Sequence, residues 1–168
     1  AVAILDGEQT VATAQAESNG KAVLRVQIPN AKLWSPDSPA LYRCRAMFDD
    51  DCTETTFGVR TLSWGDDGFL LNGKRVILLG ACVHHDHGVL GACCYSEAEE
   101  RKVRLLQKVG YNAVRCAHNP CSKAFLDACD RLGMLVMDEY ADMWYIHKTQ
   151  YDYANYLPDR WRQDLESL

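Results

Sequence analysis

The sequence predicts a chain in two parts, an antiparallel β part followed by an α/β part with a parallel sheet. In residues 1–60, short segments of alternating apolar and polar residues are separated by turn residues, which is typical of a β-sandwich. In residues 75–139, three apolar runs are separated by two stretches of helical periodicity, which is the β-α-β-α-β pattern of a parallel sheet. We place the change between the two parts near residue 64, within the segment Trp64 to Asp67.

Five short strands are expected in the β part. The clearest alternation covers residues 21–28, where the even-numbered positions are all apolar, and it predicts a half-buried strand. Asp6-Gly7, Ser18-Asn19-Gly20 and the acidic residues 49–51 supply the turns between strands. The other expected strands are residues 1–5, 10–16, 42–48 and 52–60.

The pair Asn72-Gly73 is the strongest hairpin signal in the chain, because both residues tolerate a positive φ angle. Apolar residues flank this pair on both sides, so we expect a hairpin that leads directly into the α/β part. The three strands of the α/β part are predicted from the runs RVILLG (residues 75–80), YNAVR (residues 111–115) and MLVMDE (residues 134–139).

Two helices are predicted between these strands. Ser96 and Glu99 have the spacing of a capping box, and Gly110 follows the last apolar residue of the first helix. Ser122 and Gly133 bound a shorter helix in the same way. Pro158 begins a third helical pattern, which reaches the last residue without a stop signal, so we expect the sequence to be an excerpt of a longer protein.

Polar residues follow each of the three predicted parallel strands. They are His84, His85, Asp86 and His87 after the first strand, His118 and Asn119 after the second, and Asp142 and Trp144 after the third. Ligands of parallel α/β sheets and barrels bind at the carboxyl ends of the strands. We therefore expect these side chains to converge on one pocket.

Four segments in order resemble the family 2 glycoside hydrolases: FGVRTLSWGDDGFLLNGKRVILLGACVHHDHG, NAVRCAHNP, CDRLGMLVMDEYADMW and KTQYDYANYL. The resemblance implies that residues 1–63 are the last part of an immunoglobulin-like β-sandwich. Residues 64–168 would then be about three βα units at the start of a (β/α)8 TIM barrel. The run DEYADMW followed by YDY is most similar to the bacterial β-galactosidases, with β-glucuronidases and β-mannosidases as the alternatives.

The resemblance implies a retaining exo-glycosidase that hydrolyses terminal β-galactosides. Such an enzyme uses two carboxyl groups, one as acid/base and one as nucleophile. In this family both are glutamates, one after an Asn at the end of the fourth barrel strand and one near the seventh strand. The chain contains no Asn-Glu pair, so we expect no catalytic residue in it and no activity from the isolated chain. The alternative is a non-catalytic sugar-binding or complementing segment.

The resemblance implies that this chain supplies only part of the sugar pocket. His84 and His118 match family histidines that face sugar hydroxyls, although Ala117 and Asn119 depart from the family segment R-x-S-H-x-P. The expected substrate-binding residues are His84, His118, Asn119, Asp142 and Trp144, and the expected supporting residues are Asp86, Arg115, Asp138 and Glu139. The alternatives are a structural Arg115–Glu139 ion pair, a Trp144 packed under a loop, and structural roles for His87 and His147.

Composition and cysteine spacing set further limits. The net charge is −5 without a basic run, which argues against a nucleic-acid partner, and no apolar stretch is long enough for a bilayer. The first residues do not read as a signal peptide, and cytoplasm and periplasm of a bacterium both remain open. We expect the eight cysteines to be free thiols. Neither Cys82 with the nearby histidines nor Cys116 with His118 has the spacing of a closed zinc site, so no metal is assigned.

The resemblance also bears on cofactors and partners. Family β-galactosidases can use magnesium or sodium, with ligands largely from parts outside this sequence, so none is assigned here. The expected partners are a β-galactoside or related carbohydrate and the rest of the barrel, supplied in cis or in trans. Because the sheet edges would be open, we also expect self-association.

Overall fold

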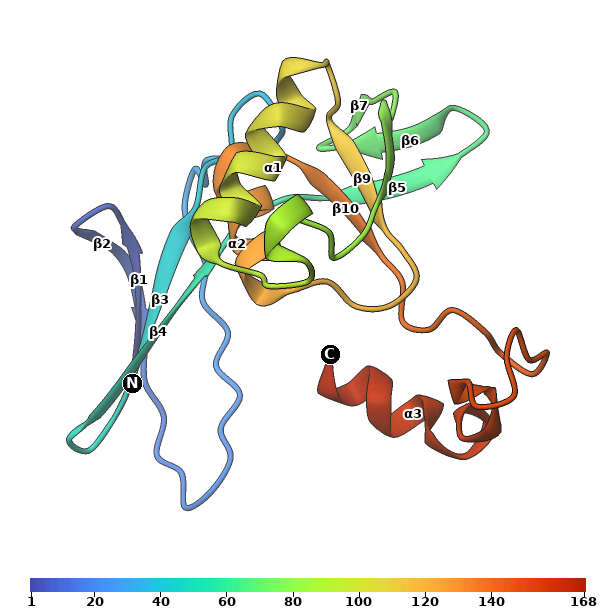
Figure 1. The fold of residues 1–168 in the computed structure, drawn as a ribbon. Helices are drawn as coiled ribbons and strands as arrows, with labels where there is room; N and C mark the ends of the chain where they lie inside the picture. The colour runs from blue at the N-terminus through green and yellow to red at the C-terminus, as the bar shows by residue number, and fades with distance from the viewer. The chain divides into compact units, whose positions relative to one another are not determined.

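The computed structural model describes residues 1–168. It contains two compact units, Ala1–Ile77 and Leu78–Leu168. The first unit is built from strands alone, and the second alternates strands with helices (Figure 1). The prediction of a β part followed by an α/β part is therefore confirmed at this level.

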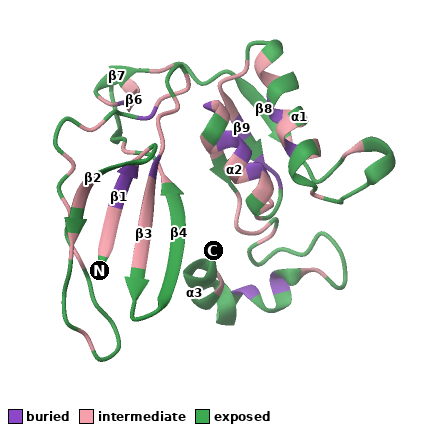
Figure 2. Ribbon diagram, turned by 90° about the vertical axis from the view of Figure 1, so that its left-hand side faces the viewer, coloured by how far each residue is buried: buried purple, intermediate pink, exposed green.

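A four-stranded antiparallel sheet forms most of the first unit. Its order is β2-β1-β3-β4, with β1 (Val2–Asp6), β2 (Gln9–Ala14), β3 (Tyr42–Phe48) and β4 (Asp51–Phe57). The hairpin between β3 and β4 turns at Asp49, which has a positive φ of 48°. Strand β4 is exposed along nearly its whole length, whereas β1 carries the buried Ile4 and Leu5 (Figure 2).

The expected strand at residues 21–28 is absent. These residues belong to the long connection between β2 and β3, and Val23 is 80% exposed. A strand needs a neighbour for its backbone hydrogen bonds, and no described strand lies beside this segment, so the alternation alone was misleading. The connection returns to the unit at Trp34, which is fully buried and donates from its backbone N to the Val59 carbonyl over 2.8 Å.

A second small sheet, of order β5-β6-β7, completes the first unit with β5 (Leu62–Gly65), β6 (Gly68–Leu71) and β7 (Lys74–Arg75). The hairpin at Asn72-Gly73 is confirmed, with φ angles of 54° and 75°. The Asn72 amide donates to the Trp34 carbonyl over 3.0 Å and accepts from the Thr61 backbone N over 3.0 Å. These bonds group residues 64–77 with the first unit, whereas the sequence placed the change of domain near residue 64. The domain limits themselves stay a prediction.

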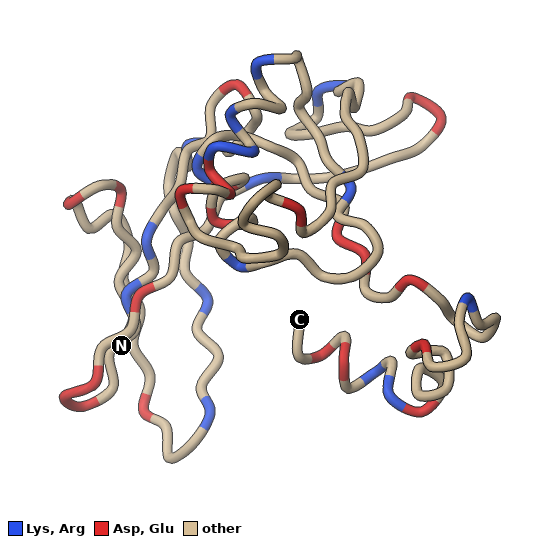
Figure 3. Tube along the Cα trace, in the orientation of Figure 1, with Lys and Arg blue, Asp and Glu red and all other residues tan.

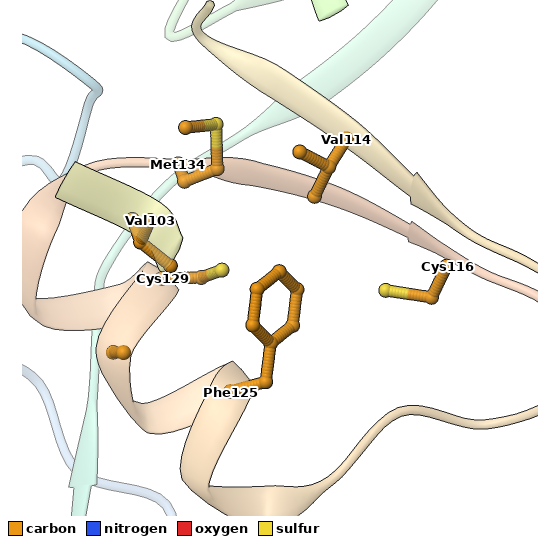
Figure 4. Packing of buried hydrophobic residues seen from close by; sticks show 7 residues of the cluster. Val103, Val114, Cys116, Phe125, Cys129 and Met134 are labelled. Atoms are coloured by element: carbon orange, nitrogen blue, oxygen red, sulfur yellow. The ribbon is translucent and has the colours of Figure 1, made fainter. Parts of the chain in front are cut away.

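The second unit contains a parallel sheet of order β10-β9-β8, with β8 (Gly80–Val83), β9 (Ala113–Cys116) and β10 (Leu135–Asp138). Helices α1 (Ser96–Lys108) and α2 (Lys123–Leu132) pack on one face (Figure 1). The core between sheet and helices consists of Val103, Val114, Cys116, Phe125, Ala128, Cys129 and Met134 (Figure 4). The outer strands β8 and β10 each lack a second neighbour.

The first parallel strand lies five residues later than predicted. The apolar residues 77–79 precede β8 and remain exposed, while Gly80 begins the strand. A Cβ atom on Gly80 would lie 1.8 Å from the Ala113 carbonyl oxygen, so only glycine fits where the two backbones meet. The remaining elements are the 3-10 turns η1 (Gly88–Leu90) and η2 (Tyr153–Asn155) and the helix α3 (Leu157–Ser167).

The predicted limits of the helices are mostly confirmed. Ser122 caps α2, because its hydroxyl accepts from the Phe125 backbone N over 3.1 Å, and Gly133 ends α2 with a φ of 82°. The capping box at Ser96 is wrong: Tyr95 is the N-cap residue without a side-chain bond, and the Glu99 side chain points into the protein. None of these helices combines the length and apolarity that crossing a bilayer requires.

Charged residues of both signs are interspersed along the chain (Figure 3). No segment of the trace carries a run of lysine and arginine, and the acidic residues gather mainly at turns and on helices. The surface therefore offers many local ion pairs rather than one large field of a single sign.

Candidate functional site

A polar pocket of about 550 Å³ lies at the carboxyl ends of the parallel strands. The segments that follow β8, β9 and β10 all contribute to it, as expected for a parallel sheet. Its lining residues are His84, His85, Ala117, His118, Asn119, Tyr140, Ala141, Asp142 and Tyr153. The structure thus brings together four of the five residues that the sequence proposed for substrate binding.

Two histidine rings lie side by side in this pocket. The ring centroids of His84 and His118 are 5.5 Å apart, with 46° between the ring planes. His84 Nδ1 lies 2.7 Å from the Ala117 carbonyl oxygen. Because a carbonyl can only accept, Nδ1 carries the hydrogen, and Nε2 of the neutral ring is then an acceptor.

Two cation–carboxylate pairs flank the His118 ring. Arg115 Nε lies 3.2 Å from Glu139 Oε1, and Glu139 Oε2 lies 3.5 Å from His118 Nδ1. The same His118 nitrogen is 3.4 Å from Asp142 Oδ1, and Lys148 Nζ lies 2.6 Å from that oxygen. His118 is half exposed, so the cluster faces solvent and presents both hydrogen-bond donors and acceptors to it.

The remaining predicted residues lie outside the polar pocket. Trp144 lines a separate apolar cavity of about 400 Å³ together with Trp161 and Leu165 of α3. Asp86 is mostly exposed and lies 3.4 Å from Lys102 Nζ. Asp138 accepts from the Cys121 backbone N over 3.1 Å and has no bond to Arg115. The roles proposed for these residues and for the pocket residues stay predictions.

Two tyrosines at the pocket were not predicted. The Tyr140 and Tyr153 hydroxyls both donate to Asp164 Oδ2 on α3, over 2.7 and 2.6 Å. Burial and this bond to Asp164 raise the pKa of Tyr140 to about 12. Both tyrosines stand in segments that resemble the family, but nothing in the sequence pairs them with a carboxylate so far along the chain.

The loop that carries His84 is fixed by a buried polar cluster. Lys102 Nζ on α1 donates to the His84 carbonyl over 2.8 Å. Glu99 is 1% exposed and accepts from the Ser122 hydroxyl over 2.9 Å. His87 Nε2 lies 3.2 Å from Glu99 Oε2, although the two are not aligned as a hydrogen bond. Sequence reasoning missed this cluster because it assigned Glu99 to a helix cap.

Comparisons with known proteins identify the family of the chain. The family "Glycosyl hydrolases family 2, TIM barrel domain" matches residues 63–156, and "Glycosyl hydrolases family 2" matches residues 3–60. A solved structure of a glycosyl hydrolase family 2 member from Bacteroides cellulosilyticus has a TM-score of 0.87 and 42% identity, and the match covers 99% of this chain and 23% of that one. The chain belongs to glycoside hydrolase family 2.

Relatives within the family carry different names. The beta-galactosidase BoGH2A of Bacteroides ovatus is 39% identical over 168 residues, which are 95% of this chain and 20% of that protein. A putative beta-glucuronidase of Formosa agariphila is 38% identical over 146 residues, which are 83% of this chain and 14% of that protein. The chain thus spans about a fifth or less of the length of these curated relatives.

Proposed function

We propose that this chain forms part of a retaining exo-glycosidase that hydrolyses terminal β-galactosides. The observation that carries the proposal is the pocket in which His84, His118 and Asp142 meet from three successive parallel strands. Membership of a glycosidase family and the similarity to a protein named beta-galactosidase support it. In this account the chain supplies one side of the sugar site.

The pocket's own chemistry is suited to binding rather than to bond cleavage. A retaining glycosidase needs a protonated carboxyl and an ionised one about 5 Å apart, on either side of the anomeric carbon. Glu139 and Asp142 are both paired with cations, Arg115 and Lys148. Both side chains thus hold the pocket together, and the sequence contains no Asn-Glu pair. The two catalytic glutamates are therefore proposed to lie outside this chain.

Each pocket residue has a proposed part in holding the sugar. His84 accepts a hydroxyl hydrogen at Nε2, because its Nδ1 is committed to a carbonyl. His118 and Asn119 bind neighbouring hydroxyls, and Asp142 accepts a hydrogen bond from one further hydroxyl. Arg115 and Glu139 hold the His118 ring in place. Trp144 is proposed to pack against an apolar sugar face once the barrel is complete.

The proposed fold is the end of an immunoglobulin-like sandwich followed by the start of a (β/α)8 barrel. The unpaired outer strands β8 and β10 support the second part, because a closed barrel has eight parallel strands and no edge. The partners proposed for these edges are the remaining barrel strands, in cis or in trans. A sugar-binding segment without a catalytic partner is the competing proposal.

A β-glucuronidase is the second candidate, because a relative of comparable identity has that name. Activity assays of the full-length polypeptide that contains this chain decide between the candidates. The substrates, each supplied separately, are nitrophenyl β-galactoside, β-glucuronide and β-mannoside. We expect the galactoside to have the highest kcat/KM. A higher value for the glucuronide would replace the proposed substrate but keep the glycosidase, and inactivity on all three would favour the binding segment.

A further inference from the structure

Three potential metal ligands meet on the helix side of the parallel sheet. Cys116 ends β9, Asp138 ends β10 directly beside it in the ladder, and Cys121 follows in the loop before α2. One sulfur of each cysteine and one carboxylate oxygen all lie within 4.8 Å of one another. From the sequence, Cys116 was weighed as a metal ligand only together with His118. The fold instead places it beside Cys121 and Asp138.

The cluster shares no side chain with the polar pocket, although both of its cysteines line a small cavity together with His84, His85 and Asn119. Successive residues of a strand point to opposite faces, so Cys116 and Asp138 lie on the opposite face from Arg115 and Glu139. Figure 4 shows the Cys116 sulfur on the side of the sheet where Phe125 packs. The cluster therefore lies on the helix side of the sheet, where Phe125 of α2 lines the same small cavity.

The three ligands are held before any ion arrives. Cys116 is 2% exposed. The Cys121 backbone N donates to Asp138 Oδ1 over 3.1 Å, and the next residue, Ser122, is fixed as the cap of α2. Tetrahedral zinc with bonds of about 2.3 Å to sulfur places neighbouring ligand atoms about 3.8 Å apart. The observed separations are at most 4.8 Å. Side-chain rotation that moves the ligand atoms by about 1 Å or less would bring them to the distance that zinc requires.

The chemistry of the ligands selects the kind of ion. Two thiols and one carboxylate suit zinc and similar thiophilic cations, whereas magnesium and sodium prefer oxygen ligands alone. The neighbouring Cys116 thiol and burial raise the pKa of Cys121. Three protein ligands leave a fourth position for water, since Cys121 is partly exposed.

We propose that Cys116, Cys121 and Asp138 bind one thiophilic divalent cation, with Zn²⁺ as the preferred ion. Binding would release one proton from each thiol to solvent, so affinity rises with pH. The bound ion would join β9, β10 and the start of α2, and would thereby fix the strand ends that lead into the sugar pocket.

Cobalt titration of the purified chain tests the proposal, because Co²⁺ bound to thiolate has a near-ultraviolet charge-transfer absorption. The chain is reduced, treated with chelator and checked for folding by circular dichroism before the titration. We expect this absorption to saturate at one equivalent of Co²⁺ and to disappear when Zn²⁺ is added. It should be absent in Cys121→Ser, and Asp138→Asn should weaken the affinity by at least about tenfold.

Cys93→Ser is the matched control, because Cys93 is an exposed cysteine of the same unit. It should retain the full absorption. A second measurement is independent of variant folding: Zn²⁺ should slow the alkylation of Cys121 in the unaltered chain but leave Cys93 reactive. The absence of thiolate absorption in the folded chain, unchanged absorption in Cys121→Ser, or equal alkylation of Cys121 with and without Zn²⁺ would overturn the proposal.

Discussion

At the scale of single residues, the pocket depends on side chains that backbone geometry and ion pairs hold in place. The Ala117 carbonyl fixes the His84 ring, and two carboxylates flank His118. Both rings are thus ordered before a sugar binds. Ordered donors and acceptors lose less entropy on binding than mobile ones.

Replacement of His118 by alanine tests this arrangement. In the full-length polypeptide, His118→Ala should lower kcat/KM for the galactoside about 2- to 10-fold, the loss of roughly 0.5–1.5 kcal/mol that a typical hydrogen bond supplies. His147→Ala is the control, because His147 pairs with Asp152 outside the pocket. Equal losses from both variants would contradict the proposed role of His118.

Glu99 is the residue on which the buried cluster depends. Glu99→Gln should lower the free energy of unfolding by about 1–3 kcal/mol, because His87 and Lys102 lose their carboxylate partner in a buried place. Urea unfolding of the chain in dilute solution, followed by circular dichroism, measures this change. Glu97→Gln, an exposed change on the same helix, should leave the midpoint almost unaltered. Equal midpoints for the two variants would show that the cluster contributes nothing.

Sequence reasoning reached the pocket residues and the Arg115–Glu139 pair beside them, but not the contacts of Glu99 and Asp164. His84, His118 and Asp142 were predicted because each follows an apolar strand at a known edge of the sheet. Glu99 and Asp164 were missed because their partners are distant in sequence, and only packing brings them together. Trp144 was assigned to the pocket from its position after a strand, whereas the structure places it in the apolar cavity.

At the scale of elements, helices were predicted better than strands. The limits of α2 follow from Ser122 and Gly133, whose effects are local. A strand depends on a neighbour, so residues 21–28 were assigned wrongly and the first parallel strand was placed too early. The hydrogen bond from the Asn72 side chain to the Trp34 carbonyl could likewise not be predicted from the sequence.

Glu100 joins the two helices of the α/β unit. Its carboxylate lies 2.7 Å from Arg104 on α1 and 3.0 Å from Arg131 on α2. The hydrogen bonds from Arg104 and then Arg131 lower the pKa of Glu100 below its ordinary value of 4.5. The stabilisation of the folded chain by Glu100 is therefore fully present above pH 4.5. It is lost as the pH falls through the lower pKa that Glu100 has in the folded chain.

The difference in urea midpoint between the unaltered chain and Glu100→Gln measures this contribution at two pH values. The difference should be present near neutral pH and should become smaller as the pH is lowered below 4.5, because the folded pKa of Glu100 lies below that value. Glu97→Gln again supplies the control for a change of charge on α1. A difference that grows as the pH falls would contradict the assignment.

At the scale of the whole molecule, the α/β unit leaves much apolar surface exposed. Leu78 and Leu79 before β8 and Met137 within β10 are exposed, and aromatic residues line the open cavity near α3. Unpaired strand edges and apolar patches favour association. The proposed barrel would cover both features with its remaining strands and helices.

The measurement that tests the account most directly is light scattering on the size-separated 168-residue chain, with a nitrophenyl β-galactoside assay of each peak. We predict self-associated or aggregated species without activity, because the sheet edges are open and the catalytic glutamates are proposed to lie elsewhere. Galactoside hydrolysis by the chain alone would contradict the account and assign catalysis to its own carboxylates. An inactive and stable monomer would favour the sugar-binding segment instead.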